Sequence, residues 1–170
     1  MIDLCRLIVC LSLVAGSAAP VFAQSAVILV RHAERADQAP GAAAMMAADP
    51  ELSDAGRARA ESLARMLRDA GITAVFTTQF KRTRQTAEPL AKALGVTVQT
   101  VDARDVDTLV AKIKSSTGTV LVVGHSNSVP DTMKGLGVEA DVTIAEAEYD
   151  NLFVVTRGTG PASMVRLRYR

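Results

Sequence analysis

The 170-residue sequence contains no tryptophan, only 4% aromatic residues, and just two cysteines and two histidines. Its 19 Lys and Arg residues are balanced by 18 Asp and Glu residues, which gives a net charge of +1. The sequence therefore lacks the basic stripe with which proteins hold a nucleic-acid backbone. We expect no nucleic acid among the partners, and any phosphate chemistry must depend on a local site.

A segment at the N-terminus differs from the rest of the chain and predicts a secretory signal peptide over residues 1–23. Arg6 precedes an apolar run at residues 7–15, which is shorter than the roughly 20 residues that a membrane-spanning helix needs. Val21 and Ala23 suit the small-residue positions of a cleavage site after residue 23.

Both cysteines, Cys5 and Cys10, lie inside this segment, so the remaining chain contains no thiol and no disulfide. No cysteine follows the apolar run, and the sequence therefore offers no site for a lipid anchor. The composition, with 49% hydrophobic and 22% charged residues, fits one globular domain at residues 24–170. We expect a periplasmic or secreted protein that has no membrane partner after cleavage.

Short apolar runs alternate with helical patterns along this domain. Strands are predicted at residues 26–30, 72–76, 96–101 and 119–123. Apolar residues that recur with i, i+3, i+4, i+7 spacing predict helices over residues 53–67, 87–94 and 106–113. Pro89 should kink the second helix or mark a late start of it. The alternation predicts an α/β sheet with helices on both faces.

The C-terminal part of the chain follows a different pattern. Two more strands are predicted at residues 151–156 and 164–169, and they are joined by turn residues in place of a helix. We expect an antiparallel hairpin at one end of a mostly parallel, mixed sheet. Residues 36–50, which are rich in alanine, form either a surface loop or a flap over the site.

Each of the two histidines closely follows a predicted apolar strand. His32 comes after residues 26–30 and Arg31, and His125 comes after residues 119–123. In open α/β sheets the carboxyl ends of the strands face the ligand crevice, so we expect both imidazoles to meet there. Two histidines in equivalent positions favour a functional role over a purely structural one.

A metal site and a serine nucleophile fit these residues less well. The sequence has no HxxxH or HExxH spacing, and the cationic neighbours of His32 would repel a metal ion. The run from Gly124 to Ser128 resembles the G-x-S-x-G nucleophile elbow up to its fifth position. No histidine follows it to act as the base, so we set this alternative aside.

A cluster of charges, Lys81-Arg82-Thr83-Arg84, follows the strand predicted at residues 72–76 and its polar extension. We expect this cluster to cap that strand and to face the same crevice. Arg31, Arg82 and two imidazoles in one pocket would bind a tetrahedral dianion, because guanidinium groups hold phosphate oxygens bidentately at any pH. Nearby cations also lower the pKa of an imidazole, which keeps a nucleophilic nitrogen unprotonated.

Four motifs that contain these residues resemble those of the histidine phosphatase superfamily, the phosphoglycerate-mutase-like group. In chain order they are Arg31-His32-Ala33-Glu34, Leu52-Ser53-Asp54-Ala55-Gly56, Lys81-Arg82-Thr83-Arg84-Gln85-Thr86-Ala87-Glu88 and Val123-Gly124-His125-Ser126. They occur in the family's order and cover most of the domain. The run from Gly124 to Pro130 is similar to that of small secreted members.

The resemblance implies that His32 is the nucleophile that becomes phosphohistidine. It implies that Arg31, Arg82 and His125 bind the phosphate of a small phosphorylated substrate. It also implies a three-layer αβα sandwich and a reaction that needs no metal or other cofactor. Transfer first to histidine and then to water divides a difficult hydrolysis into two easier steps.

The sequence departs from the family at the acid that protonates the leaving oxygen. Many members supply a glutamate between the second arginine motif and the second histidine, and no such motif is recognisable here. Glu34, Asp105 and Asp131 are the candidates, and for each of them the alternative is a helix cap or a solvated carboxylate.

The expected function is that of an exported phosphomonoesterase. A mutase fits less well, because phosphoglycerates are intracellular metabolites and the chain without its signal peptide is short for that branch. A phosphohistidine-protein phosphatase and a non-catalytic anion-binding protein on the same fold are the alternatives. The presence of both histidines favours catalysis over binding alone.

Overall fold

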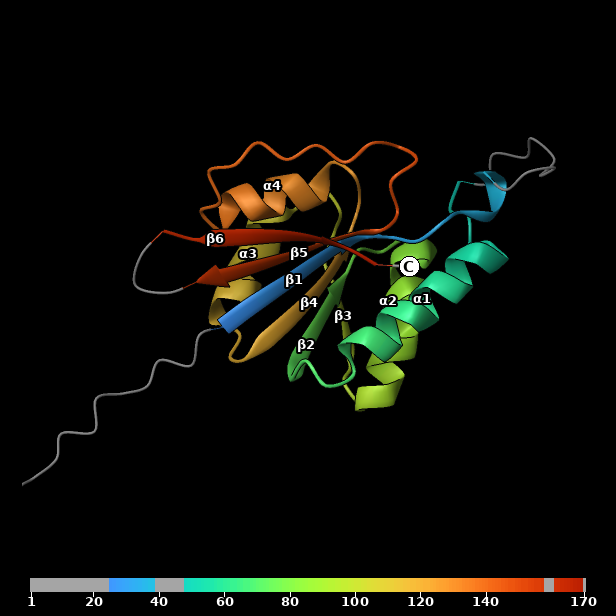
Figure 1. The fold of residues 1–170 in the computed structure, drawn as a ribbon, viewed down its shortest axis with the longest axis horizontal. Coiled ribbons are helices and arrows are strands. Elements are labelled where there is room, and N and C mark those ends of the chain that lie inside the picture. Colours follow the sequence, from blue (N-terminus) through green and yellow to red (C-terminus); the bar gives the residue numbers. More distant parts are fainter. Residues whose placement is uncertain (1–24, 39–47, 158–160, 170) are drawn as a thin grey trace, which may run out of the picture.

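The computed structural model describes residues 25–38, 48–157 and 161–169 (Figure 1). They form a six-stranded sheet with the strand order β3-β2-β4-β1-β5-β6. The strands are β1 (Ser25–Arg31), β2 (Ile72–Thr77), β3 (Val98–Thr100), β4 (Thr119–Gly124), β5 (Asn151–Arg157) and β6 (Ser163–Arg168). The strands β1 to β4 are parallel to one another, whereas β5 is antiparallel to both of its neighbours, β1 and β6. The predicted mixed sheet with a C-terminal antiparallel pair is confirmed.

Helices cover both faces of this sheet (Figure 1). They are α1 (Asp54–Leu67), α2 (Lys81–Leu94), α3 (Val106–Ser115) and α4 (Ser128–Gly135), and the short 3-10 helix η1 (Ala36–Gln38) precedes α1. α1 and α2 pack on one face, and α3 and α4 pack on the other. The expected three-layer αβα sandwich is therefore confirmed.

The central strand β1 contributes to the core on both faces. Val27 and Leu29 pack with residues of α3 and α4, whereas Ile28 and Val30 pack with residues of α1 and α2. Successive side chains of a strand point to opposite faces, so a strand that is covered twice must be apolar throughout. This burial explains the uninterrupted apolar run of β1 and fixes the position of the residues that follow it.

Two helix ends are set by the residues that stand there. Ser53 is the N-cap of α1, and its hydroxyl accepts a hydrogen bond of 3.1 Å from the backbone N–H of Gly56. Gly95 ends α2 with a φ of 66°, a left-handed conformation that glycine adopts without strain.

Two helices differ from expectation. α2 begins at Lys81, six residues before the predicted start, and Pro89 lies inside it. The residues buried in its first turns are Thr83 and Thr86. Because threonine is polar, an apolar periodicity does not reveal this part of the helix. α4 was not predicted at all, because it is short and also turns polar groups inward, among them Thr132. β3 is shorter than the predicted strand at residues 96–101.

Several expectations fall on residues outside the described ranges. The predicted signal peptide, residues 39–47 of the loop or flap, and residues 158–160 of the C-terminal turn are among them. Within the residues that are described, no helix is long and apolar enough to cross a membrane.

Candidate active site

The two histidines directly follow the neighbouring parallel strands β1 and β4, at the same end of the sheet. Arg31 at the end of β1 lies opposite Gly124 at the end of β4. The backbone N–H of His32 donates a hydrogen bond of 2.9 Å to the carbonyl oxygen of Gly124. The imidazole ring centroids of His32 and His125 are 5.4 Å apart. The structure thus brings together the two rings that the strand pattern placed at one edge of the sheet.

The His32 ring is held in one orientation by its own backbone neighbour. Its Nδ1 lies 2.8 Å from the carbonyl oxygen of Ala33, and since a carbonyl can only accept, Nδ1–H is the donor. The lone pair of the neutral ring is therefore on Nε2. The side chain is 3% exposed, and burial is the largest cause of a lowered pKa of about 3. His125, Arg31 and Arg82 lower the pKa further by smaller amounts.

The sequence predicted that Arg82 caps a strand. In the structure it belongs to the first turn of α2 instead. Its guanidinium carbon lies 4.3 Å from the centroid of the Phe80 ring, which is a cation–π contact. One guanidinium nitrogen lies 3.5 Å from Nδ1 of His125, and the other is 3.8 Å from a carboxylate oxygen of Asp49. The helix start adds its own positive dipole at this place.

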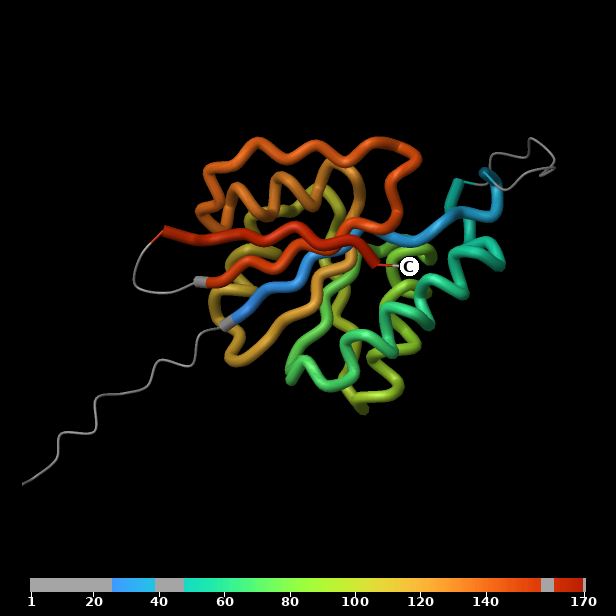
Figure 2. The backbone as a smooth tube through the Cα atoms, in the orientation of Figure 1, coloured from blue at the N-terminus to red at the C-terminus, as the bar shows by residue number. Residues whose placement is uncertain are grey.

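Arg31 is almost completely buried and is anchored from a distant part of the chain. Its Nη1 donates to the carbonyl oxygens of Ala145 (2.8 Å) and Glu146 (2.9 Å). Its Nη2 lies 3.0 Å from a carboxylate oxygen of Glu146, and the ring of Tyr149 lies 4.3 Å from its guanidinium carbon. Figure 2 shows the connection between α4 and β5, in orange, passing across the end of β1, in blue. Sequence reasoning gave this connection no role.

His125 is joined to a pair of buried threonines. Its Nε2 lies 3.0 Å from the hydroxyl of Thr78, which lies 2.9 Å from the hydroxyl of Thr83. The Thr83 hydroxyl is 2.8 Å from the carbonyl oxygen of Phe80. Burial is the main cause of a lowered His125 pKa of about 4, and Arg82 and Arg31 add to it. The Thr83 hydroxyl donates to the Phe80 carbonyl and so accepts from Thr78, whose hydroxyl then accepts from Nε2–H of His125. The lone pair of His125 is therefore on Nδ1, which faces Arg82.

These groups share one cavity of about 310 Å³. It is lined by Arg31, His32, Arg35, Phe80, Arg82, Ala103, Arg104, His125, Ser126, Asn127 and Glu146. Four guanidinium groups against one carboxylate make it an anion site, and its polar, rigidly held donors suit a tetrahedral oxyanion. All four of the predicted site residues line it.

None of the three candidate acids lines this cavity. The carboxylate of Glu34 is bound by the guanidinium of Arg59 at 2.6 to 2.9 Å and faces a separate, open cavity of about 770 Å³. Asp105 caps α3 by accepting a hydrogen bond of 3.0 Å from the backbone N–H of Thr108. Asp131 is exposed on α4. Among the described residues, no three potential metal-ligating side chains come together.

An αβα sandwich with Arg31, His32 and His125 at the carboxyl ends of two strands and Arg82 at the start of α2 defines a phosphate-type anion site on an α/β scaffold. Residues 27–105 match the family model of the histidine phosphatase superfamily (branch 1). The resemblance to this superfamily is confirmed, and the match supports a phosphatase. No curated protein matches the chain.

Solved structures of similar proteins support the fold. A structure of the protein histidine phosphatase SixA with tungstate has a TM-score of 0.67 at 18% identity, covering 84% of this chain and 96% of that one. A protein assigned as the phosphohistidine phosphatase SixA of Agrobacterium tumefaciens has a TM-score of 0.57 at 24% identity, covering 79% and 92%. A mycobacterial glucosyl-3-phosphoglycerate phosphatase with VO3 has a TM-score of 0.66 at 14% identity, covering 85% and 99%. At these identities the structures establish the fold.

Proposed function

We propose that the protein is an exported phosphomonoesterase that hydrolyses a small phosphate ester through a phosphohistidine on His32, without a metal. The observation that carries this proposal is the state of the His32 ring. Its Nδ1–H is bound to the Ala33 carbonyl, its pKa is low, and Nε2 is left with a lone pair beside the anion-binding groups. A neutral, oriented imidazole is a nucleophile at any pH near neutrality.

The reaction has two steps. In the first, Nε2 of His32 attacks phosphorus, the new P–N bond forms, and the bond from phosphorus to the leaving oxygen breaks. In the second, a water oxygen attacks phosphorus, the P–N bond breaks, and inorganic phosphate is released. The guanidinium groups of Arg31 and Arg82 offset the charge on the phosphoryl oxygens in both steps.

The size and charge of the cavity support a small, anionic substrate. A volume of about 310 Å³ accommodates a phosphoryl group with a compact alcohol, and Arg35 and Arg104 add positive charge to its lining. Export rests on the predicted signal peptide at residues 1–23. A second candidate function is the dephosphorylation of phosphohistidine in proteins, which the structural likeness to SixA supports.

The test is hydrolysis of p-nitrophenyl phosphate by the purified protein, with and without EDTA. We expect activity that EDTA does not change and that His32→Ala abolishes. A brief reaction with a radiolabelled phosphate ester, quenched at alkaline pH where phosphohistidine persists, should label the wild type and leave the variant unlabelled. Circular dichroism checks that the variant is folded.

Three outcomes would contradict the proposal. Binding of vanadate without turnover would indicate the non-catalytic anion-binding protein. Loss of activity in EDTA that zinc or magnesium restores would indicate a metalloenzyme. A phosphohistidine-containing peptide that is hydrolysed far faster than any small ester would favour the second candidate function.

A further inference from the structure

The cavity around the two imidazoles contains a carboxylate that sequence reasoning did not consider. Among the described residues that line it, Glu146 is the single acid. One of its carboxylate oxygens lies 3.0 Å from Nη2 of Arg31, and the other lies 3.3 Å from the hydroxyl of Ser126. The side chain is 76% exposed, so it stands at the mouth of the cavity where a leaving group would depart.

The other carboxylates near the cavity are engaged in structural contacts. Asp37 accepts two hydrogen bonds from the guanidinium of Arg35. Asp49 accepts from the backbone N–H of Lys81 at 3.0 Å and thereby caps the start of α2. Replacing either would disturb the elements that carry the site. Glu146 has contacts with a cavity residue and a cavity-edge hydroxyl, which a bound substrate could replace.

The backbone that carries Glu146 is fixed on both sides. The Nη1 of Arg31 donates hydrogen bonds to the carbonyl oxygens of Ala145 and Glu146. Glu148 accepts a hydrogen bond of 3.0 Å from the backbone N–H of Ala145 and is itself bound by Arg168 at 2.7 Å. The Cα of Glu146 is therefore held in place, and its exposed side chain can turn once its contacts with Arg31 and Ser126 are replaced. A group that first donates and then accepts a proton requires this freedom.

We propose that Glu146 is the general acid and base of the phosphatase reaction. In the first step its carboxyl proton passes to the leaving oxygen as the P–O bond breaks, so that a neutral alcohol departs. In the second step the carboxylate takes a proton from the attacking water as the new P–O bond forms and the P–N bond to His32 breaks. The proton balance closes, and Glu146 is again protonated. This inference rests on the proposed function.

Binding of substrate would free Glu146 for this role. In the free protein the Glu146 carboxylate lies 3.0 Å from Nη2 of Arg31. A bound phosphate competes for the same guanidinium group, so the Glu146 side chain is released to face the leaving oxygen. Arg35 and Tyr149 interact electrostatically with Glu146, and the other titratable groups that line the same cavity are Arg82, Arg104, His32 and His125.

The experiment compares Glu146→Gln with wild type on p-nitrophenyl phosphate and on an alkyl phosphate such as glycerol phosphate. An aryl oxide leaves without a proton, whereas an alkoxide does not. We expect kcat/KM for the alkyl ester to fall at least ~100-fold and kcat/KM for the aryl ester to change by less than about 5-fold. Glu146→Asp, which keeps the carboxyl group, should recover part of the alkyl activity.

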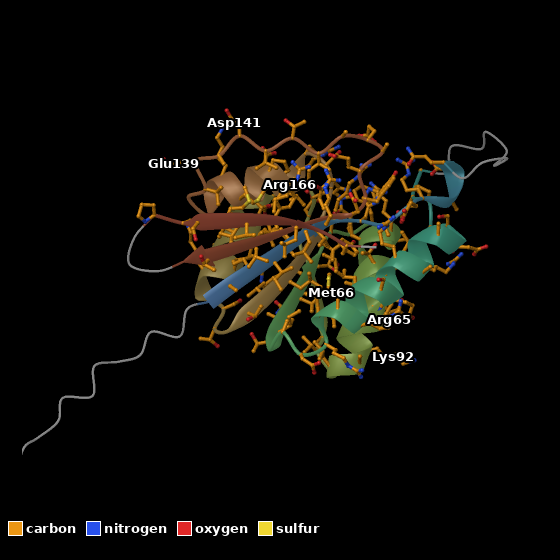
Figure 3. All side chains as sticks on the ribbon, in the orientation of Figure 1. Arg65, Met66, Lys92, Glu139, Asp141 and Arg166 are labelled. Carbon is orange, nitrogen blue, oxygen red and sulfur yellow. The ribbon has the colours of Figure 1, made fainter. Side chains whose placement is uncertain are left out.

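Glu139→Gln is the matched control. Glu139 lies on the same connection between α4 and β5, is exposed, and lies in Figure 3 at the outer edge of the molecule. Its replacement should leave both activities unchanged. The pH profile gives a second measurement, because the alkaline limb of kcat for the alkyl ester should be present in wild type and Glu146→Asp and absent in Glu146→Gln.

The outcomes separate this inference from the proposed function. Wild type that hydrolyses neither ester, or activity that survives His32→Ala, would contradict the phosphohistidine mechanism itself. Active wild type with both esters slowed equally by Glu146→Gln would leave that mechanism intact and overturn the role of Glu146. A rise in kcat/KM for both esters would overturn it too, because Glu146 would then be a competitor of the substrate for Arg31.

Discussion

The Arg82 guanidinium is held by contacts that an ammonium group cannot make. Its central carbon lies 4.3 Å from the centroid of the Phe80 ring, and two of its nitrogens lie near His125 and Asp49. We predict that Arg82→Lys lowers kcat/KM for p-nitrophenyl phosphate at least ~10-fold, about 1.4 kcal/mol of transition-state stabilisation. Steady-state kinetics measure the effect, and the free energy of unfolding should change little.

Arg84→Lys provides the comparison for this prediction. It makes the same chemical change two residues further along α2, at an exposed position that does not line the cavity. Its kinetics should match those of wild type. Equal kinetics for Arg82→Lys and Arg84→Lys would show that the basic cluster is simply a solvated helix turn.

The residues of the candidate phosphate site could be predicted from the sequence, whereas the proposed acid could not. His32 and His125 follow apolar strands, and that placement is visible in the pattern of residues. Glu146 lies in a stretch with no apolar periodicity, and its position depends on hydrogen bonds from Arg31, 115 residues away. Thr78 is likewise an unremarkable polar residue until the fold brings His125 to 3.0 Å from it.

At the scale of an element, the structure explains why the motif at residues 52–56 ends in glycine. The backbone of α1 at Gly56 lies too close to the backbone of Glu34 to leave room for a side chain. A Cβ at this position would lie 2.3 Å from the backbone carbonyl oxygen of Glu34, which itself accepts from the N–H of Ser53 at 2.9 Å. The start of α1 is thus pressed against the chain that leaves β1 just after His32. Gly56 of this motif allows the close approach of two backbones, and Ser53 of the same motif caps the helix.

We predict that Gly56→Ala destabilises the protein although alanine is the better helix former. The clash is with backbone, which cannot rotate away, so the cost of about 1–3 kcal/mol typical of overpacking should exceed the gain of up to ~1 kcal/mol in helix propensity. Urea unfolding measures the difference. Glu61→Ala, at an exposed position of the same helix, should stay within about 0.5 kcal/mol of wild type. Unchanged stability of Gly56→Ala would mean that α1 shifts freely.

Strands and long amphipathic helices could be predicted from periodicity, because apolar burial is what creates that periodicity. The start of α2 could not be, because the residues that it turns inward there are Thr83 and Thr86, whose hydroxyls bind backbone carbonyls within the same turns. α4 escaped prediction for a similar reason, since the Thr132 hydroxyl bonds the Ser128 carbonyl at 2.7 Å. Polar residues whose hydroxyls donate hydrogen bonds within their own helix turn can be buried. Such burial produces no apolar periodicity in the sequence.

On the scale of the whole molecule, the site depends on two features. One is the parallel part of the sheet, and the other is the connection between α4 and β5, which brings the chain back to the end of β1. The parallel pairing of β1 with β4 places His32 and His125 at one edge, and α2 begins beside them. The connection from α4 then crosses the end of β1 before the chain enters β5 (Figure 2). Burial of both imidazoles follows from this enclosure, and it links the candidate site to the stability of the fold.

That link predicts an acid-sensitive fold. Burial lowers the pKa of His32 to about 3 and of His125 to about 4, from 6.5 in the unfolded chain. Between these values the unfolded state binds more protons, so their contribution to stability is complete above pH 6.5 and is lost as pH falls towards 3. The loss approaches about 1.4 kcal/mol per pH unit for each histidine.

The two imidazoles can be separated from other titrating groups by the pH window. Carboxylates with lowered pKa values, Glu34 and Glu148, lose their contribution only as pH falls below their unfolded value of 4.5. The sequence has no other histidine, so the slope between pH 6.5 and 5 belongs to His32 and His125. We predict that urea unfolding at several pH values gives a falling free energy of unfolding across this window in wild type. The slope should halve in His32→Ala and nearly vanish when His125 is also replaced by alanine, and an equal slope in all three proteins would show that the imidazoles are accessible to protons in the folded state.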